Sequence, residues 1–189
     1  MYGVPLLEPV HLDRRLSWCA FNNFRSVDVR KNTGVHFFID DYLFLRVWND
    51  PARYAAFLNG FAAVMTPDFS LFTDYPPAVQ IYNHFRKHLL GSYWQALGMT
   101  VVPSICWSDH CSFDWCFDGE PVGGTVAVSS VGTQKNRIAR QLFLDGYNEM
   151  LSRLSPEKII FFGDVPEGCD GNIEHHDPFY KAVDSRRRG

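Results

Sequence analysis

Short runs of apolar residues that end in an acid recur along this chain of 189 residues. They lie at residues 35–41, 62–68, 99–109 and 158–164, and each run is followed or ended by aspartate. Continuous apolar runs bounded by turn residues are typical of strands that are buried on both faces. The repeat therefore predicts several buried strands whose carboxyl ends all present polar side chains.

Helical segments separate these runs. Asp50 predicts an N-cap with Pro51 in the first turn, for a helix that extends to about residue 59. A longer helix over residues 76–97 has apolar residues at helical spacing along one face, and another is expected over residues 134–154 with Thr133 as its cap. The residues that define the face of the longer helix are Val79, Tyr82, Arg86/Leu90, Tyr93 and Leu97.

The alternation of strands and helices predicts an α/β fold with a mainly parallel sheet and right-handed crossovers. The predicted strands are residues 35–39, 61–65, 99–107, 125–129 and 158–162. Because so many strands end in polar residues, we favour an incomplete, barrel-like arrangement over the alternative, an open doubly wound sheet. In both architectures, ligands bind at the carboxyl ends of the strands.

The length fits one domain. We expect residues 1–33 to form an N-terminal arm that packs on the body, residues 34–165 to form a single α/β domain, and residues 166–189 to form a C-terminal tail.

Composition excludes several classes of protein. The chain is 46% hydrophobic and 21% charged, which is ordinary for a globular protein, and its apolar runs are far shorter than the ~20 residues of a membrane span. No signal peptide is recognisable, so a cytoplasmic protein without a membrane partner is expected. The net charge of −3 argues against a general nucleic-acid coat, and a nucleic-acid role rests only on the basic residues between Arg14 and Lys31.

Cysteines and histidines offer weaker signals. Five cysteines do not suggest a disulfide framework, and the even spacing of Cys106, Cys111 and Cys116 fits core thiols better than a zinc cluster. His84 and His88 have the i, i+4 spacing that can bind zinc, but no Glu-based motif surrounds them. In the same way, the His-His-Asp run at residues 175–177 fits a surface loop better than a metal site.

The repeated acids are the main candidates for chemistry. Carboxylates gathered at one rim can hold Mg²⁺ or Mn²⁺, or one of them with a raised pKa can serve as general acid and base. The alternative is that each aspartate only begins a turn or caps a helix. The predicted catalytic residues are Asp40, Asp41, Asp68, Asp109 and Arg86, whose guanidinium suits a carboxylate or phosphate.

A set of polar residues and one tryptophan completes the candidate site. The stretch at residues 129–133 joins a strand to a helix N-terminus, which favours anion binding, although it has neither a phosphate-loop nor a dinucleotide-binding pattern. The predicted binding residues are Ser70, Gln80, Asn83, Trp107, Ser129 and Ser130.

Several of these pieces resemble domain-of-unknown-function family 4417, which occurs in bacteria and in phage or mobile-element genomes. The most specific piece is Thr-Pro-Asp-Phe-Ser at residues 66–70, and others lie at residues 38–42, 47–51, 80–86, 91–95 and 116–119. The resemblance implies a phage-type or mobile-element-type protein and implies no particular chemistry.

Two classes of function remain open. The first is an enzyme that uses the strand-end carboxylates on a small phosphate- or sugar-containing substrate, such as a nucleotide or a nucleic-acid end. The second is a non-catalytic binding or inhibitory protein that targets a host protein or ligand. The small size of the chain and its high aromatic content (15%) favour this class.

Overall fold

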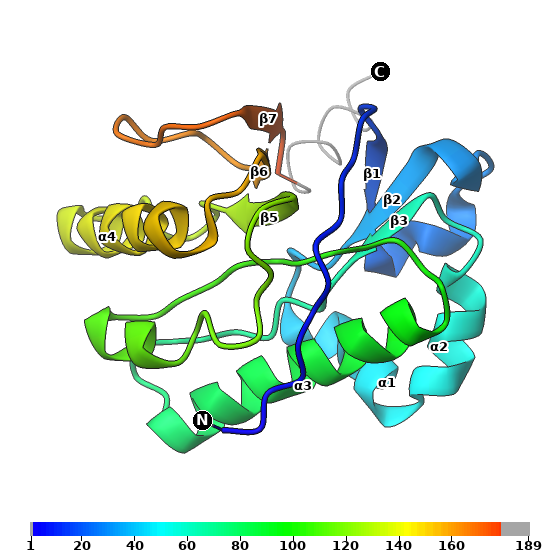
Figure 1. Ribbon diagram of the computed structural model, residues 1–189, viewed down its shortest axis with the longest axis horizontal. Coiled ribbons are helices and arrows are strands. Elements are labelled where there is room, and N and C mark those ends of the chain that lie inside the picture. Colours follow the sequence, from blue (N-terminus) through cyan, green and yellow to red (C-terminus); the bar gives the residue numbers. More distant parts are fainter. Residues whose placement is uncertain (1, 179–189) are drawn as a thin grey trace.

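Parallel strands alternate with helices along residues 2–178, the part of the chain that the computed structural model describes (Figure 1). The strands are β1 (Ser17–Ala20), β2 (Thr33–His36), β3 (Ala63–Met65), β4 (Val101–Val102), β5 (Thr125–Ser129), β6 (Lys158–Phe162) and β7 (Ile173–His176). The α-helices are α1 (Asp41–Asn49), α2 (Pro51–Leu58), α3 (Pro77–Ala96) and α4 (Arg137–Leu154), and the 3₁₀ segments are η1 (Phe21–Ser26), η2 (Arg30–Asn32) and η3 (His110–Asp114). The predicted α/β class is confirmed.

The strands lie side by side in the order of the chain. One sheet has the order β1-β2-β3-β4 and the other β5-β6-β7, and every pair is parallel. A parallel bridge between Ser104 and Ala127 links the two sheets just beyond β4. Within residues 2–178 the strand order does not reverse, and such a reversal is what creates the switch point of a doubly wound sheet.

The two sheets curve toward each other. The ring of His36 on β2 lies 4.6 Å from that of Phe162 on β6, although these strands are far apart in the strand order. At the two ends of the order, the Arg15 guanidinium donates to the His175 carbonyl oxygen at 3.0 Å. Within residues 2–178 no backbone ladder joins β1 to β7, so the barrel-like arrangement is open.

Local sequence explains several element boundaries. The Asp50 carboxylate accepts from the Arg53 amide at 3.3 Å and Pro51 opens α2, as predicted. The cap of α4 is Asn136, which accepts from the Ala139 amide at 2.8 Å, so the expectation of Thr133 as the cap is wrong. Thr133 instead donates its hydroxyl to the Ser130 carbonyl oxygen within the preceding turn.

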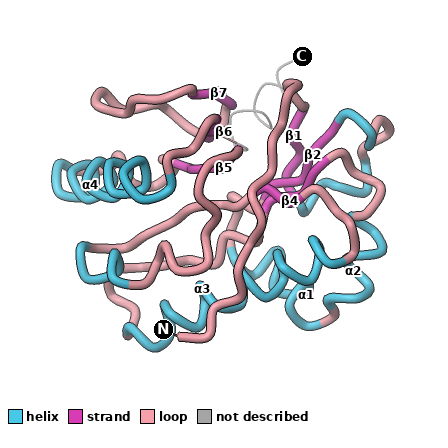
Figure 2. The backbone as a smooth tube through the Cα atoms, in the orientation of Figure 1, coloured by secondary structure: helices cyan, strands magenta, loops and turns pink. Residues whose placement is uncertain are grey.

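The strand predicted over residues 99–107 is much shorter in the structure. Regular pairing ends at Val102, because Pro103 has no amide hydrogen to donate to a ladder. Pro103 still accepts from the Ala127 amide at 2.8 Å, and the Ile105 amide donates to the Ala127 carbonyl oxygen at 2.8 Å. Figure 2 shows the long connection from β4 to β5, which is loop except for η3.

Strands are also present in both segments that the sequence places outside the central domain. β1 lies within residues 1–33 and pairs with β2, and β7 lies within residues 166–189 and pairs with β6. The first residues of the chain run across the amino-terminal ends of β5 and β6, where Val10 accepts from the Thr125 amide at 2.6 Å. This segment therefore covers the end of the sheets opposite to the carboxyl ends of the strands.

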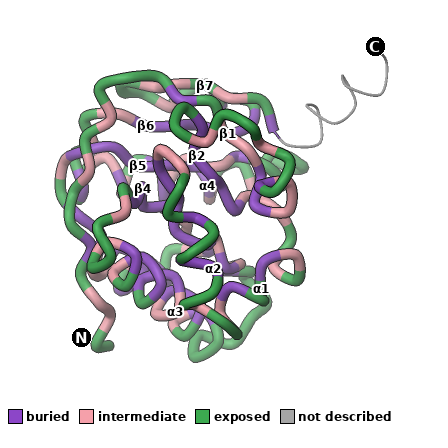
Figure 3. The backbone as a smooth tube through the Cα atoms, turned by 90° about the vertical axis from the view of Figure 1, so that its right-hand side faces the viewer, coloured by how far each residue is buried: buried purple, intermediate pink, exposed green. Residues whose placement is uncertain are grey.

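Two apolar clusters fill the interior. α4 packs on one face of β5–β7 through Phe143, Tyr147 and Met150, whereas Leu90 and Trp94 of α3 join the cluster around β2–β4. Figure 3 shows much of β2–β6 and part of α3 coloured as buried, whereas β1 and β7 are mostly intermediate or exposed.

Candidate functional site

A cavity of about 480 Å³ opens where the continuations of β4 and β5 diverge. Its walls come from the carboxyl ends of four neighbouring strands and from the start of α4. The lining residues include Phe38, Ile39, Asp40, Asp68, Ser70, Phe72, Cys106, Trp107, Ser108, Ser129, Gly132, Thr133, Lys135, Leu142 and Phe143. Strand-end crevices of this kind are where α/β proteins bind their ligands.

Asp68 follows β3 and contributes a carboxylate to this cavity. Its Oδ1 atom is buried and has no hydrogen-bond partner among residues 2–178. The Cys106 thiol forms a hydrogen bond with the same carboxyl group. Burial raises the pKa of Asp68 to about 6; Lys87 and the bond to Cys106 oppose the increase, and Asp41 adds to it. A carboxyl group in this state can hold or release a proton near neutral pH.

The other strand-end acids have different roles. Asp40 lines the cavity, but Asp41 turns to the 66–70 loop, where its carboxylate accepts from the Ser70 hydroxyl at 2.8 Å and from the Ser70 amide at 3.2 Å. Asp109 accepts from the Ser112 amide at 3.2 Å and caps η3, away from the cavity lining. Of the four acids in the predicted catalytic set, the cavity thus brings together Asp40 and Asp68.

Arg86 and Asn83 support the same loop from α3. Asn83 donates to the Ser70 carbonyl oxygen at 2.7 Å, and Arg86 donates to Asn83 Oδ1 at 2.5 Å. The Arg86 guanidinium lies 3.8 Å from the centre of the Phe69 ring and forms a cation–π contact with it. Neither Asn83 nor Arg86 lines the cavity; both hold the segment that carries Asp68.

The η3 side of the cavity is fixed by tight contacts. Ser108 donates its hydroxyl to Gln80 Oε1 at 2.6 Å, while Gln80 donates to the Tyr75 carbonyl oxygen at 2.8 Å. The Trp107 indole donates to the Leu142 carbonyl oxygen at 3.2 Å and lies against Gly146, where an added Cβ would be 2.2 Å from Nε1. Trp107 is therefore a rigid wall of the cavity.

The β5–α4 side carries the positive part of the lining. Ser129 accepts from the Val131 amide at 3.2 Å and lines the cavity, whereas Ser130 donates to the Asp164 carbonyl oxygen at 2.7 Å and does not. Lys135 is the single cationic side chain among the described lining residues. It stands beside the N-terminus of α4, which favours anions.

Among the lining residues that the sequence analysis did not propose for the site, Cys106 and Lys135 carry a thiol and a positive charge. Cys106 was expected to be only a core thiol, but it contacts Asp68 at the cavity, and burial raises its pKa well above the usual value. Its position within the strand-end run is a signal that could have found it. Of the other two cysteines in the set, Cys111 is exposed and Cys116 is buried.

Comparison with known proteins assigns this chain to a family. The model of the domain of unknown function DUF4417 matches residues 1–177. The chain belongs to this family. DUF4417 relatives include the Gene 1 protein of Mycobacterium phage L5, 38% identical over 188 residues (99% of this chain and 82% of the relative), and the Gene 1 protein of Mycobacterium phage D29, 35% identical over 188 residues (99% and 70%).

Both relatives are phage proteins, which confirms the phage association implied by the resemblance. No solved structure matches this DUF4417 chain. Among residues 2–178, no helix has the length and apolar character that a membrane crossing requires.

Proposed function

We propose that the strand-end cavity of this DUF4417 protein binds a small phosphate- or sugar-containing substrate, of nucleotide type, and that Asp68 acts on it. The observation that carries this proposal is the buried Asp68 Oδ1 atom, which has no partner among residues 2–178 although it belongs to a cavity wall. An unpaired buried acceptor costs stability, so its retention is typical of a group that a ligand satisfies.

The distribution of charge supports the orientation of such a ligand. Lys135 and the start of α4 offer an anion-binding end, whereas Asp40 and Asp68 offer acceptors for hydroxyl groups at the other polar part of the lining. Phe72 and Trp107 supply flat apolar surface suited to a base or a sugar face. We infer that the phosphate lies toward Lys135 and the reacting hydroxyl or water toward Asp68.

Asp68 has two possible modes of action in this proposal. It accepts a proton from a substrate hydroxyl or water as a general base, with the Cys106 thiol fixing the orientation of its carboxyl group. Alternatively, Asp40 and Asp68 hold Mg²⁺ or Mn²⁺, since hard cations prefer carboxylate oxygens and the unpartnered Oδ1 is available.

Calorimetric titration separates these possibilities. Ribose 5-phosphate and a set of nucleoside monophosphates are titrated into the wild type, with and without Mg²⁺ or Mn²⁺, and compared with Asp68→Asn and Lys135→Ala. We expect Lys135→Ala to weaken binding at least tenfold, and the exposed control Lys31→Ala to leave it unchanged. Metal binding lost in Asp68→Asn supports the metal mode. No binding by the wild type, or equal binding by all variants, would refute the proposal.

A second candidate is a non-catalytic protein that binds or inhibits a host protein. Exposed aromatic side chains on α1, on the loop between β3 and α3, and on α3 favour it. Tyr42 is 74% exposed, Phe72 53% and Tyr82 48%. In this case Tyr42→Ser combined with Tyr82→Ser abolishes binding to a captured host protein, while Asp68→Asn keeps it. The reverse pattern would support the cavity instead.

A further inference from the structure

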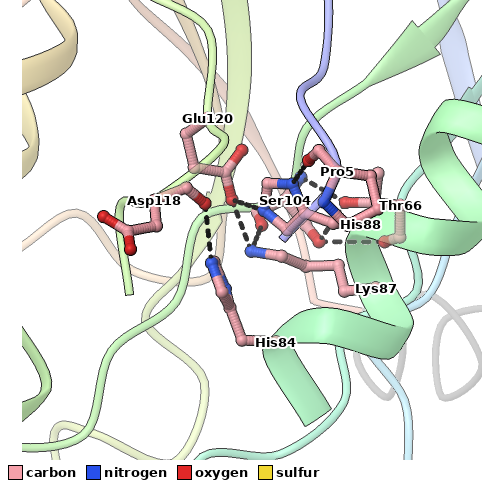
Figure 4. A network of polar contacts seen from close by, with 8 residues as sticks. All are labelled: Pro5, Thr66, His84, Lys87, His88, Ser104, Asp118 and Glu120. Carbon is pink, nitrogen blue, oxygen red and sulfur yellow. Dashed lines mark hydrogen bonds and ion pairs between the residues drawn. The ribbon is translucent and has the colours of Figure 1, made fainter. Parts of the chain in front are cut away.

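A second group of polar side chains lies buried on the inner face of α3, apart from the cavity lining (Figure 4). We call His84, Lys87, His88 and Glu120 the α3 polar cluster. Their side chains are at most 1% exposed. Three of the four residues have atoms that can bind a metal ion.

The geometry of these three residues fits one ion. His84 and His88 are one helical turn apart with ring centroids separated by 4.4 Å, and Glu120 reaches them from the turn after η3. One ligand atom from each lies within 4.8 Å of the others. His88 Nε2 is 3.0 Å from Glu120 Oε1, close to the separation of about 3.3 Å between neighbouring ligands in a tetrahedral zinc site with bonds of about 2.0 Å.

The outer nitrogens of both rings are held by backbone carbonyl oxygens. His84 Nε2 lies 2.8 Å from the Asp118 oxygen, and His88 Nδ1 lies 2.9 Å from the Pro5 oxygen. Since a carbonyl oxygen only accepts, each of these nitrogens carries the proton of its ring. A histidine that binds a metal is usually oriented in this way, with its other nitrogen free to coordinate.

The inner atoms lack the partners that they need. His84 Nδ1 and Glu120 Oε2 are buried and have no hydrogen-bond partner within the described part of the chain. Both accept, and His88 Nε2 also faces a carboxylate oxygen. A proton between His88 and Glu120 would satisfy that contact alone, whereas one metal ion serves all three residues. We propose that the α3 polar cluster binds one divalent transition-metal ion of the zinc class through His84, His88 and Glu120.

Lys87 sets the strength of this site. Its ammonium group donates to Glu120 Oε1 at 2.5 Å and to the Ser104 carbonyl oxygen at 2.9 Å, which places a positive charge beside the ion. The repulsion weakens the affinity for the ion, so the site is predicted to be moderate in strength. Because all three ligand residues are buried, the ion would have a structural role. It would hold the Pro5 segment and the 118–120 turn against α3.

Metal loading is tested during refolding, because the site is closed in the folded protein. The full-length chain is unfolded in chelator, refolded with Co²⁺ or Zn²⁺ alone, and freed of excess ion. We expect visible Co²⁺ absorption from a site with nitrogen and oxygen ligands at one ion per chain, and a rise of about 5–10 °C in the thermal midpoint when free Zn²⁺ is a hundredfold above Kd.

Variants assign the ligands. His84→Gln loses the spectrum and the thermal shift, whereas the exposed control His110→Gln and the variant His175→Gln keep both. Lys87→Met removes the competing charge, so we expect Zn²⁺ to bind at least tenfold more tightly and to restore the stability that this variant lacks without metal.

The wild-type titration decides the outcome even when a ligand variant fails to fold. Absence of the Co²⁺ spectrum and of the thermal shift in the wild type overturns the proposal. Binding by Lys87→Met alone also overturns it, and would identify the Lys87 ammonium as the permanent occupant of the cluster. Loss of binding in His175→Gln would place the ion at β7 instead.

Discussion

Replacing Asp68 by asparagine should stabilise the protein above pH 6. The buried carboxyl has a pKa of about 6 instead of its usual 3.8. Because each pH unit between the folded and unfolded pKa values is worth about 1.4 kcal/mol, ionising Asp68 costs the folded state about 3 kcal/mol at pH 7. The sign follows from the raised pKa: the unfolded chain loses this proton first, so wild-type stability falls as the pH rises from about 4 to about 6.

Asp68→Asn removes this penalty while it keeps an oxygen that can accept from Cys106. The free energy of unfolding is measured by urea titration from pH 4 to pH 8, with Asp74→Asn as a control at an exposed carboxylate. The difference between Asp68→Asn and wild type should increase from less than about 1 kcal/mol at pH 4 to about 3 kcal/mol at pH 7, or about 6–12 °C in thermal midpoint. A difference that does not change with pH, or a variant less stable than wild type at pH 7, would refute the reasoning.

Three other substitutions test parts of the fold. Gly146→Ala places a Cβ 2.2 Å from Trp107 Nε1, so we expect the free energy of unfolding in urea to fall by about 1–3 kcal/mol and the tryptophan fluorescence to change. Unchanged stability would mean that the indole moves freely. Glu120→Gln leaves the Lys87 charge buried without its carboxylate and should cost about 3–5 kcal/mol in metal-free protein, unless the lysine reaches solvent. Asp50→Ala removes the cap of α2 and should cost about 1 kcal/mol, and a neutral result in thermal unfolding would show that the cap is dispensable.

Local sequence was sufficient for the parts of the fold in which backbone preference and burial agree. The apolar runs at residues 125–129 and 158–162 are strands with the predicted bounds, and Asp50-Pro51 begins a helix. Asp68, which the sequence places directly after a buried strand, likewise lies in the wall of the cavity. Each of these features depends on a few neighbouring residues.

The orientation of α3 could not be obtained in this way. Its apolar residues Val79, Tyr82 and Tyr93 are 37–48% exposed, whereas polar residues such as Gln80 and His84 are buried. A pattern of apolar residues identifies the core face only when burial is apolar. Here distant groups satisfy the buried polar side chains: Ser108 for Gln80, and the Asp118 carbonyl oxygen for His84.

The sequence by itself determined the α/β class, the strand ends as the location of a candidate site, and the placement of an acid there. Tertiary structure decided which acids share a cavity, because Asp41 and Asp109 are each taken up by nearby donors while Asp40 and Asp68 remain in its walls. It also brought Glu120 to His84 and His88 across more than thirty residues of chain. The physical reason is that a polar side chain acquires its role from its partners, and the partners of Asp41, His88 and Glu120 come from distant segments.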